Sequence, residues 1–397
     1  MKKIKILLRD FRKIVKNGEV VNFNIGTTGH GVGEAAALEK MLPECEICFW
    51  ASAPLSEPLR RMMRRRFPGC RIVQGALDGS SPEVEDAARW SDLLLIGPGT
   101  WIDVPQDVMA FTRFCGKPYG AAGIGFAAKD LDLIRQSSFM FFRDTEALAA
   151  AERAGVKVPT GFVPDGAFAF DAEDAPGAEQ FLAEHGLEKN RFACCLPRYR
   201  ITPVWEFCPG KHPSAEHMER NRSMIRQDMM PLVEASCRVV REKHWKVLLS
   251  PETEPAVRLC QNELASMFPE DVRPHIVIPA NFWEADLALG VYRRSCGLFG
   301  TEMHSQVMAV GSGIPAIVCR TVEFGSKSRM WNDIGLGEWL FDFDSAADRE
   351  RFPEAVMRMF TQEKHAGQLV ERAQKIISGR FLLFTKLAVG LGWYTDP

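Results

Sequence analysis

The residue best suited to chemistry is His304, in the stretch of residues 298–319 that reads LFGTEMHSQVMAVGSGIPAIVC. An apolar run ends just before Thr301, which can cap a helix by accepting a backbone N–H bond. A helical pattern then continues to Gly311, and Pro315 opens a second apolar run. In a parallel α/β sheet, the start of the helix that follows a strand lines the ligand crevice. The pattern therefore predicts that His304 lies at such a crevice.

Two interpretations of His304 fit this position. A lone histidine is often only a satisfied polar residue, whereas an imidazole that titrates near neutral pH also suits proton transfer. Met303, Val307 and Val310 follow the i, i+4, i+7 spacing of a buried helix stripe, so His304 lies one position off that stripe. We therefore favour a functional role for His304.

Glycines gather in residues 26–34, which read GTTGHGVGE. Residues 20–25 alternate as a strand does and the next residues, EAAALEKML, favour a helix, so we predict a strand-to-helix loop here. The loop matches neither a Walker A motif nor a clean dinucleotide fingerprint. Gly31, Gly33 and Glu34 are candidate ligand-binding residues, but the glycines equally suit the close approach of a neighbouring strand.

Two further strand ends carry candidate binding residues. Residues 92–96 form a nearly continuous apolar strand, and Gly99 and Thr100 follow it in a glycine-rich turn. The apolar run FMFF ends at Arg143, next to Asp144, which we expect to cap the following helix. For Arg143, bidentate binding of an anion and a structural role fit the sequence equally well.

Strand and helix patterns alternate in two series, separated by the acidic, proline-containing and glycine-containing residues 172–177. We therefore predict two doubly wound α/β domains, residues 1–175 and 176–345, that face each other across a cleft. The C-terminal helices, residues 346–397, are expected to pack back toward the first domain. In the second series, a polar insertion over residues 202–223 is expected to precede a helix.

Composition excludes several function classes. The chain has 397 residues, of which 46% are hydrophobic and 25% charged, as in soluble globular proteins. Its 49 basic and 51 acidic residues give no net field for nucleic acid. The sequence shows no signal peptide and no apolar run long enough to span a membrane, so we expect a cytoplasmic protein. Cys45 and Cys48 form a CxxC within a predicted strand, so we expect neither a redox site nor a metal site.

Three blocks of the sequence resemble the polysaccharide pyruvyl transferase family. The most specific is residues 139–168, which look like the family's strand ending in Arg-Asp, its helix ending in Gly, and its closing Pro-Asp-x-Ala-Phe. The second, GTEMHSQVMAVGSGIPAIV, resembles the family's histidine-bearing helix with Gly-x-Pro leading into a strand. More loosely, HGVGEAAALEKML, DLLLIGPGT and KPYGAAGIGF are similar to its N-terminal loop, helix and glycine-rich strands.

The resemblance implies a two-domain fold similar to the GT-B glycosyltransferases. It also implies transfer of a pyruvyl group from phosphoenolpyruvate to two hydroxyls of a cell-surface polysaccharide or its precursor, without a cofactor. His304 would be the catalytic histidine and Arg143 the functional arginine, and Asp165 of the closing motif would help to bind substrate.

One residue departs from the family pattern. Glu302 stands where the family usually has an arginine, two residues before the histidine, and its carboxylate would repel an anionic donor. Other cations would then have to complete the donor site. The candidates follow predicted strands of the second series and are Arg198, Arg200, Arg320 and Lys327.

Two alternatives remain beside pyruvyl transfer. A GT-B glycosyltransferase with a nucleotide-sugar donor would hold the diphosphate through a helix N-terminus and through glycines such as Gly311 and Gly313. A glycan-binding protein of the same shape would carry out no transfer at all. The acceptor sugar and the oligomeric state are not encoded in any motif, although an oligomer is compatible with the sequence.

Overall fold

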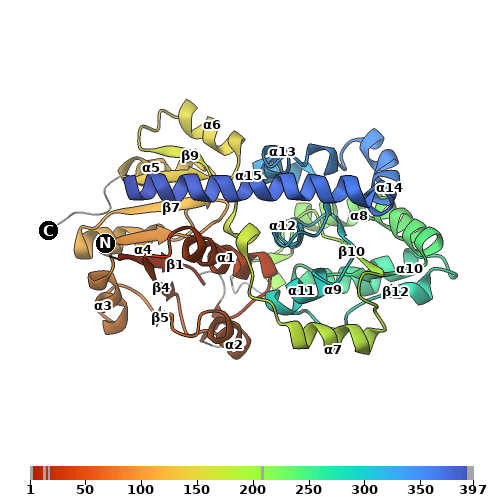
Figure 1. The fold of residues 1–397 in the computed structure, drawn as a ribbon, viewed down its shortest axis with the longest axis horizontal. Helices are drawn as coiled ribbons and strands as arrows, with labels where there is room; N and C mark the ends of the chain where they lie inside the picture. Colours follow the sequence, from red (N-terminus) through yellow and green to blue (C-terminus); the bar gives the residue numbers. More distant parts are fainter. Residues whose placement is uncertain (1–2, 12–14, 17, 207–209, 391–397) are drawn as a thin grey trace. The chain divides into compact units, whose positions relative to one another are not determined.

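The computed structural model describes residues 3–11, 15–16, 18–206 and 210–390, and the chain folds into two compact units (Figure 1). The first unit holds the described residues of Met1–Asn22, Thr27–Ala172 and Lys375–Pro397, and the second holds those of Phe23–Gly26 and Glu173–Gln374. The chain leaves the first unit after Ala172, within the acidic stretch that we expected to be a linker.

The described part of the first unit is built on a parallel sheet of seven strands. In spatial order these are β5 (Arg71–Gln74), β4 (Cys45–Ala51), β1 (Ile4–Arg9), β6 (Leu93–Ile96), β7 (Tyr119–Ile124), β8 (Phe139–Phe142) and β9 (Thr160–Phe162). Strands β6 and β8 are buried along their whole length, which explains why their sequences are continuous apolar runs. Because strand order proceeds outward from β1 in both directions, the connecting helices cover both faces of the sheet.

Alternate residues of β8 show which helices cover which face of this sheet. Met140 and Phe142 belong to the same core cluster as Val108 of helix α4 (Pro105–Cys115). Phe139 and Phe141 instead contact Phe384 of α15 (Glu363–Gly390), the long helix drawn in blue in Figure 1. The other helices of this unit are α1 (Ile25–Met41), α2 (Glu57–Arg66), α3 (Pro82–Trp90), α5 (Leu131–Gln136) and α6 (Thr145–Arg153).

The second unit has a parallel sheet of six strands among the residues that the structure describes. Their order is β12 (Ile276–Val277), β11 (Lys246–Leu249), β10 (Phe192–Leu196), β13 (Leu298–Gly300), β14 (Ala316–Arg320) and β15 (Leu340–Asp342). The helices are α7 (Ala175–His185), α8 (Ala215–Arg238), α9 (Glu254–Arg258), α10 (Ala265–Met267), α11 (Ala285–Tyr292), α12 (His304–Gly311), α13 (Arg329–Asp333) and α14 (Ala346–Thr361). The predicted fold class, two doubly wound α/β domains, is confirmed.

The prediction of a strand-to-helix loop at residues 26–34 is wrong, because these residues form the first turns of α1. The prediction of a strand over residues 20–25 is also wrong. Strand β3 (Glu19–Val20) ends at Val20, and it pairs antiparallel with β2 (Val15–Lys16). The low helix propensity of glycine is outweighed by packing. A Cβ on Gly31 would lie 2.1 Å from Oδ2 of Asp10, and one on Gly33 would lie 2.1 Å from the carbonyl oxygen of Gly166.

Three helix boundaries also differ from the predictions. Helix α12 begins only at His304, and the backbone N–H of Thr301 instead donates to the carbonyl of Leu196 at 2.8 Å. Helix α8 begins inside the expected insertion, because Ser214 caps it by accepting from the backbone N–H of His217 at 3.0 Å.

Helix α15 continues to Gly390, although the residue pattern predicts a helix that ends at Ser378. Its residues up to Gln374 and the whole of α14 belong to the second unit, whereas its residues from Lys375 belong to the first. The last seven of the residues expected to form the C-terminal helices, residues 391–397, lie outside the described part of the chain.

Candidate functional site

A buried glutamate holds His304 at the start of α12. Glu252 follows β11, and its Oε1 lies 3.0 Å from Nδ1 of His304. The other carboxylate oxygen, Oε2, accepts a hydrogen bond of 2.7 Å from the backbone N–H of Ser305. The Glu252 side chain is 1% exposed and that of His304 is 12% exposed. The carboxylate therefore fixes both the orientation of the imidazole and the helix N-terminus that carries it.

Glu252 is ionised in this arrangement. Burial by itself would raise the pKa of Glu252, but the hydrogen bond and charge of His304, together with the bonds from Ser305, outweigh burial and lower it to about 2. A carboxylate beside an imidazole stabilises the imidazolium that forms when the ring takes up a proton. His304 and Glu252 can thus act together as a base and its supporting carboxylate.

Two further contacts position this pair. The hydroxyl of Tyr292 lies 2.8 Å from Oγ of Ser250 and donates to Oγ of Ser305 at 3.1 Å, which ties the end of β11 to the start of α12. A Cβ on Gly26 would lie only 2.2 Å from Cγ of His304, so the backbone of α1 packs directly against the imidazole. Only glycine fits at that position without displacing the ring.

Glu302 lies near this pair and is 2% exposed. Burial and the negative charge of Glu252 raise the pKa of Glu302 well above its ordinary value, which favours the neutral carboxylic acid. Its Oε2 is 3.9 Å from Nε of Arg198, and its Oε1 accepts no hydrogen bond among the described residues. The pKa values of the two glutamates are therefore shifted in opposite directions, which is typical of an acid and a base in one site.

Two cations share one aromatic ring close to Glu302. The guanidinium of Arg198 lies over Phe324 at 4.9 Å from the ring centroid, and Nζ of Lys327 lies 4.4 Å from the same centroid. Both side chains act electrostatically on Glu302. Arg198 also donates to Oγ1 of Thr202 at 3.3 Å. The pair forms a positively charged patch that suits an anionic ligand.

The other two predicted cations of this unit are held by carboxylates. The guanidinium of Arg200 is buried and forms two bonds of 2.7 and 2.8 Å to Asp228 and one of 2.6 Å to Asp344. Arg320 pairs with Asp342 at 3.2 Å and its side chain is 37% exposed. Arg200 therefore joins the loop after β10 to α8 and to the residues after β15, whereas Arg320 joins the ends of β14 and β15.

The first unit contains a second group of buried charges. Arg143 follows β8, and its closest carboxylate oxygens are Oδ2 of Asp165 at 3.9 Å and Oδ2 of Asp144 at 4.0 Å. Asp144 caps α6 as expected, by accepting from the backbone N–H of Ala147 at 2.7 Å. Burial lowers the pKa of Arg143, although the charges of Asp165 and Asp144 oppose this shift. Among the residues that the structure describes, the side chain of Arg143 forms only these long ion pairs, and such a buried guanidinium is suited to binding a further anion.

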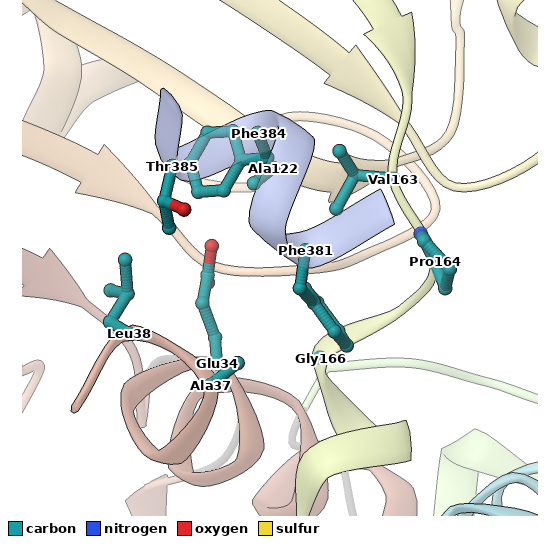
Figure 2. Close-up of a pocket in the computed structure, with 10 residues that line it drawn as sticks. All are labelled: Glu34, Ala37, Leu38, Ala122, Val163, Pro164, Gly166, Phe381, Phe384 and Thr385. Carbon is teal, nitrogen blue, oxygen red and sulfur yellow. The ribbon is translucent and has the colours of Figure 1, made fainter. Parts of the chain in front are cut away.

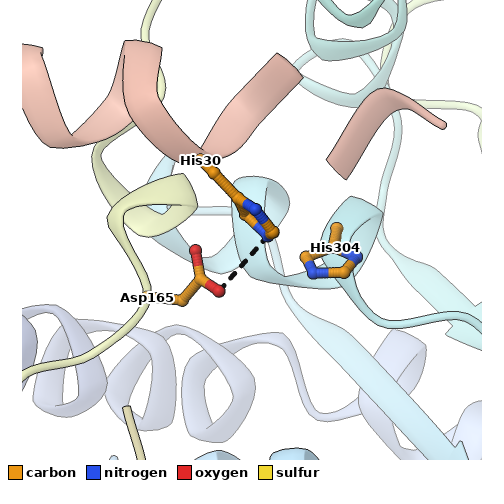
Figure 3. A group of neighbouring side chains, drawn as sticks. All are labelled: His30, Asp165 and His304. Atoms are coloured by element: carbon orange, nitrogen blue, oxygen red, sulfur yellow. Dashed lines mark ion pairs between the residues drawn. The ribbon is translucent and has the colours of Figure 1, made fainter. Parts of the chain in front are cut away.

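Asp165 joins this group to α1. Its Oδ1 accepts from the backbone N–H of Ala167 at 3.0 Å, which caps a short 3-10 turn. Figure 3 shows its Oδ2 directed at Nε2 of His30, 3.4 Å away. The structure therefore brings together Arg143 and Asp165, both candidates from the sequence, and adds His30 to them.

The remaining candidates of the first unit have packing roles in the structure. Glu34 of α1 is buried and lines a small, largely apolar pocket with Phe381 and Phe384 of α15 (Figure 2). The carbonyl of Gly99 accepts from the backbone N–H of Gly125 at 2.8 Å, which extends the pairing at the end of β7.

Thr100 is exposed, and its carbonyl oxygen would lie 2.4 Å from a Cβ on Gly125. Cys45 and Cys48 lie in β4, where burial raises the pKa of each thiol to about 11. Both thiols are therefore protonated at neutral pH.

Sequence reasoning missed Glu252, His30 and Gly26. A signal was present for Glu252, because it follows a buried strand just as Arg143 does. His30 and Gly26 carried no such signal, since both lie in a segment that we expected to be a loop. Their partners are far away in the sequence and become visible only in the folded structure.

Neither a protein-family model nor a curated protein matches this chain. Solved structures match over nearly all of it at low identity. A putative UDP-N-acetylglucosamine 2-epimerase from Listeria monocytogenes is 15% identical over 100% of this chain and 98% of its own, with a TM-score of 0.56. The UDP-GlcNAc 2-epimerase from Neisseria meningitidis bound to UDP-GlcNAc is 9% identical over 98% and 100%, with a TM-score of 0.57.

An α,α-trehalose 6-phosphate synthase from Burkholderia multivorans is 12% identical over 100% of both chains, with a TM-score of 0.50. At such identities the similarity shows the fold alone. Together with the two parallel sheets, it shows that the fold is of the GT-B type.

Proposed function

We propose that this chain is a GT-B-type glycosyltransferase that uses a nucleotide-sugar donor. The observation that carries the proposal is the buried pair of His304 and Glu252 at the carboxyl end of a parallel sheet, the position where ligands bind in α/β folds. The similarity of fold to enzymes of sugar-nucleotide chemistry, one of them with UDP-GlcNAc bound, supports the same donor class.

In such a reaction an acceptor hydroxyl attacks the anomeric carbon of the donor sugar. The bond between that carbon and the diphosphate breaks, and the nucleoside diphosphate leaves with the electron pair. We assign removal of the hydroxyl proton to Nε2 of His304, the ring nitrogen opposite the bond to Glu252. The ionised carboxylate of Glu252 stabilises the resulting imidazolium.

The leaving diphosphate carries negative charge that the protein must stabilise. Arg198 follows β10 and Lys327 follows β14, and both supply positive charge over the ring of Phe324. The raised pKa of Glu302 favours its uncharged form, which reduces the repulsion of an anion there.

Pyruvyl transfer from phosphoenolpyruvate is the second candidate, and Arg143 is the observation that favours it. This arginine is 3% exposed, makes only long ion pairs, and occupies the place that the family resemblance assigns to a functional arginine. In this reaction a proton is added to the vinyl carbon and a sugar hydroxyl attacks the adjacent carbon. Phosphate then leaves, and a second hydroxyl closes the ketal.

Thermal unfolding in the presence of UDP, UDP-GlcNAc or phosphoenolpyruvate distinguishes the two candidates. A ligand at about 100 times its Kd stabilises the folded state by about 2.7 kcal/mol, which is a shift of several degrees in Tm. If the first proposal is right, UDP raises the Tm and phosphoenolpyruvate does not. Arg198→Ala and Lys327→Ala then lose the shift, while Arg143→Lys keeps it.

The opposite pattern supports pyruvyl transfer, because lysine cannot reproduce the bidentate fork of Arg143. In that case phosphoenolpyruvate raises the Tm of the wild type and fails to raise that of Arg143→Lys. Under either chemistry, His304→Gln should bind donor normally but turn over about 10²–10⁴ times more slowly. If no ligand raises the Tm, both proposals are wrong.

A further inference from the structure

The C-terminal half of α15 exposes leucines on the side that faces away from the first unit. Leu382, Leu383 and Leu387 are 40%, 45% and 42% exposed. The opposite side of the same turns is buried, and there Phe381 and Phe384 hold the helix to the unit. The three leucines therefore do not serve the packing of this helix onto the unit.

Cations accompany these leucines. Lys375, Arg380 and Lys386 are all exposed on the same half of the helix. The sequence contains no aspartate or glutamate between Arg372 and Gly390, although the chain as a whole has a net charge of −2. Helical spacing places Lys375 and Lys386 on the side of Leu382, whereas the guanidinium of Arg380 lies 5.3 Å from the ring centroid of Phe162.

We propose that this face of α15, formed by Leu382, Leu383, Leu387, Lys375 and Lys386, binds the surface of an anionic lipid bilayer. A helix that lies in the membrane interface combines leucines, which enter the headgroup region, with cations, which meet anionic headgroups. Lysine stems can extend along the apolar layer while their charged ends stay in water. No helix in the described part of the chain is long and apolar enough to span a membrane, so the helix lies along the surface.

Charge decides between a bilayer and a second copy of the chain. A symmetric dimer would bring this face against itself, because a two-fold interface uses the same patch on both copies. The lysines of one copy would then approach those of the other, and residues 373–390 contain no aspartate or glutamate. An anionic bilayer offers the opposite charge across the whole face.

Flotation of the full chain with lipid vesicles tests the proposal. Vesicles of phosphatidylcholine alone should bind little protein, and vesicles of equal parts phosphatidylcholine and phosphatidylserine should bind it in a manner that weakens as salt is added. The double variant Leu383→Ser/Leu387→Ser and the charge reversal Lys386→Glu should each lose about tenfold in vesicle affinity. All of these side chains are exposed, so the Tm of each variant should stay near that of the wild type.

Helix α4, on the other face of the sheet, offers matched controls. Met109 is 44% exposed and Arg113 is also exposed, so Met109→Ser and Arg113→Glu repeat the same chemical changes away from α15. Both controls should bind vesicles as the wild type does.

Absence of binding to phosphatidylserine vesicles, or equal losses in the α4 controls, would overturn the proposal. So would a dimer in analytical ultracentrifugation that the α15 leucine variant dissociates, because it would assign this face to a second copy.

Discussion

At the scale of single residues, Glu252 and Glu302 show how position sets the charge of a carboxyl group. Both are buried in the second unit, yet the bonds from His304 and Ser305 lower the pKa of Glu252 to about 2, whereas burial and Glu252 itself raise that of Glu302. Glu252 therefore contributes stability above pH 4.5 that is lost as the pH falls toward about 2. Glu302 instead contributes stability at acidic pH that is lost as the pH rises.

Replacing Glu302 with glutamine tests this assignment. Because the folded-state pKa of Glu302 lies above the ordinary value of 4.5, its contribution to stability is full below pH 4.5 and is lost as the pH rises through the folded value. Glutamine cannot ionise, so Glu302→Gln should match the wild type at acidic pH and exceed its Tm by a few degrees at neutral pH. Tm measured from pH 4 to pH 9, with the exposed Glu270→Gln as control, checks this. A variant less stable than the wild type at neutral pH would mean that Glu302 is ionised in the folded protein.

At the scale of elements, the sequence predicts well where local pattern and tertiary packing agree. The continuous apolar runs of β6 and β8 and the capping of α6 by Asp144 are visible in the sequence because each depends on neighbouring residues. The site could be predicted only in part. His304 and Arg143 each follow a strand, but the bond between His304 and Glu252 joins residues 52 positions apart.

Helix α1 shows the opposite case, in which a local rule fails. Its glycines predict a loop, and the reasons for the helix are Asp10, Gly166 and His304, none of which is near in the sequence. Local reasoning about Gly26 would also mislead, since an alanine in a helix is normally about 1 kcal/mol more favourable than a glycine.

We expect Gly26→Ala to impair the site despite that gain. The added Cβ would meet the imidazole of His304 at 2.2 Å, so the ring must move. A displacement of about 1 Å in a catalytic group can cost about 10²-fold in rate. Turnover with the donor that binds should therefore fall strongly, and the NMR signals of the His304 ring should shift. Gly367→Ala in α15, where nothing lies within 4 Å, should leave both unchanged.

At the scale of the whole molecule, α15 is a single helix whose two halves belong to different units. Its first residues, up to Gln374, belong to the second unit, and those from Lys375 belong to the first. In the first unit, Phe384 contacts Phe139 at 6.0 Å and Phe141 at 5.2 Å between ring centroids. The C-terminal residues are thus part of the core of a unit that the chain begins, leaves and finally rejoins.

This arrangement predicts that a change near the C-terminus destabilises the N-terminal strands. Phe384→Ala removes a buried ring of α15 that packs against β8. The free energy of unfolding should fall by about 3–5 kcal/mol, because the cavity that the ring leaves can close only in part. Amide hydrogen exchange should then accelerate in β7 and β8, while β10 and β13 of the second unit keep the protection of the wild type. Leu383→Ala changes the neighbouring, 45% exposed residue and should leave exchange unaltered in both sheets. Equal acceleration in the two sheets would show that the units unfold as one cooperative block, against the division of α15 described here.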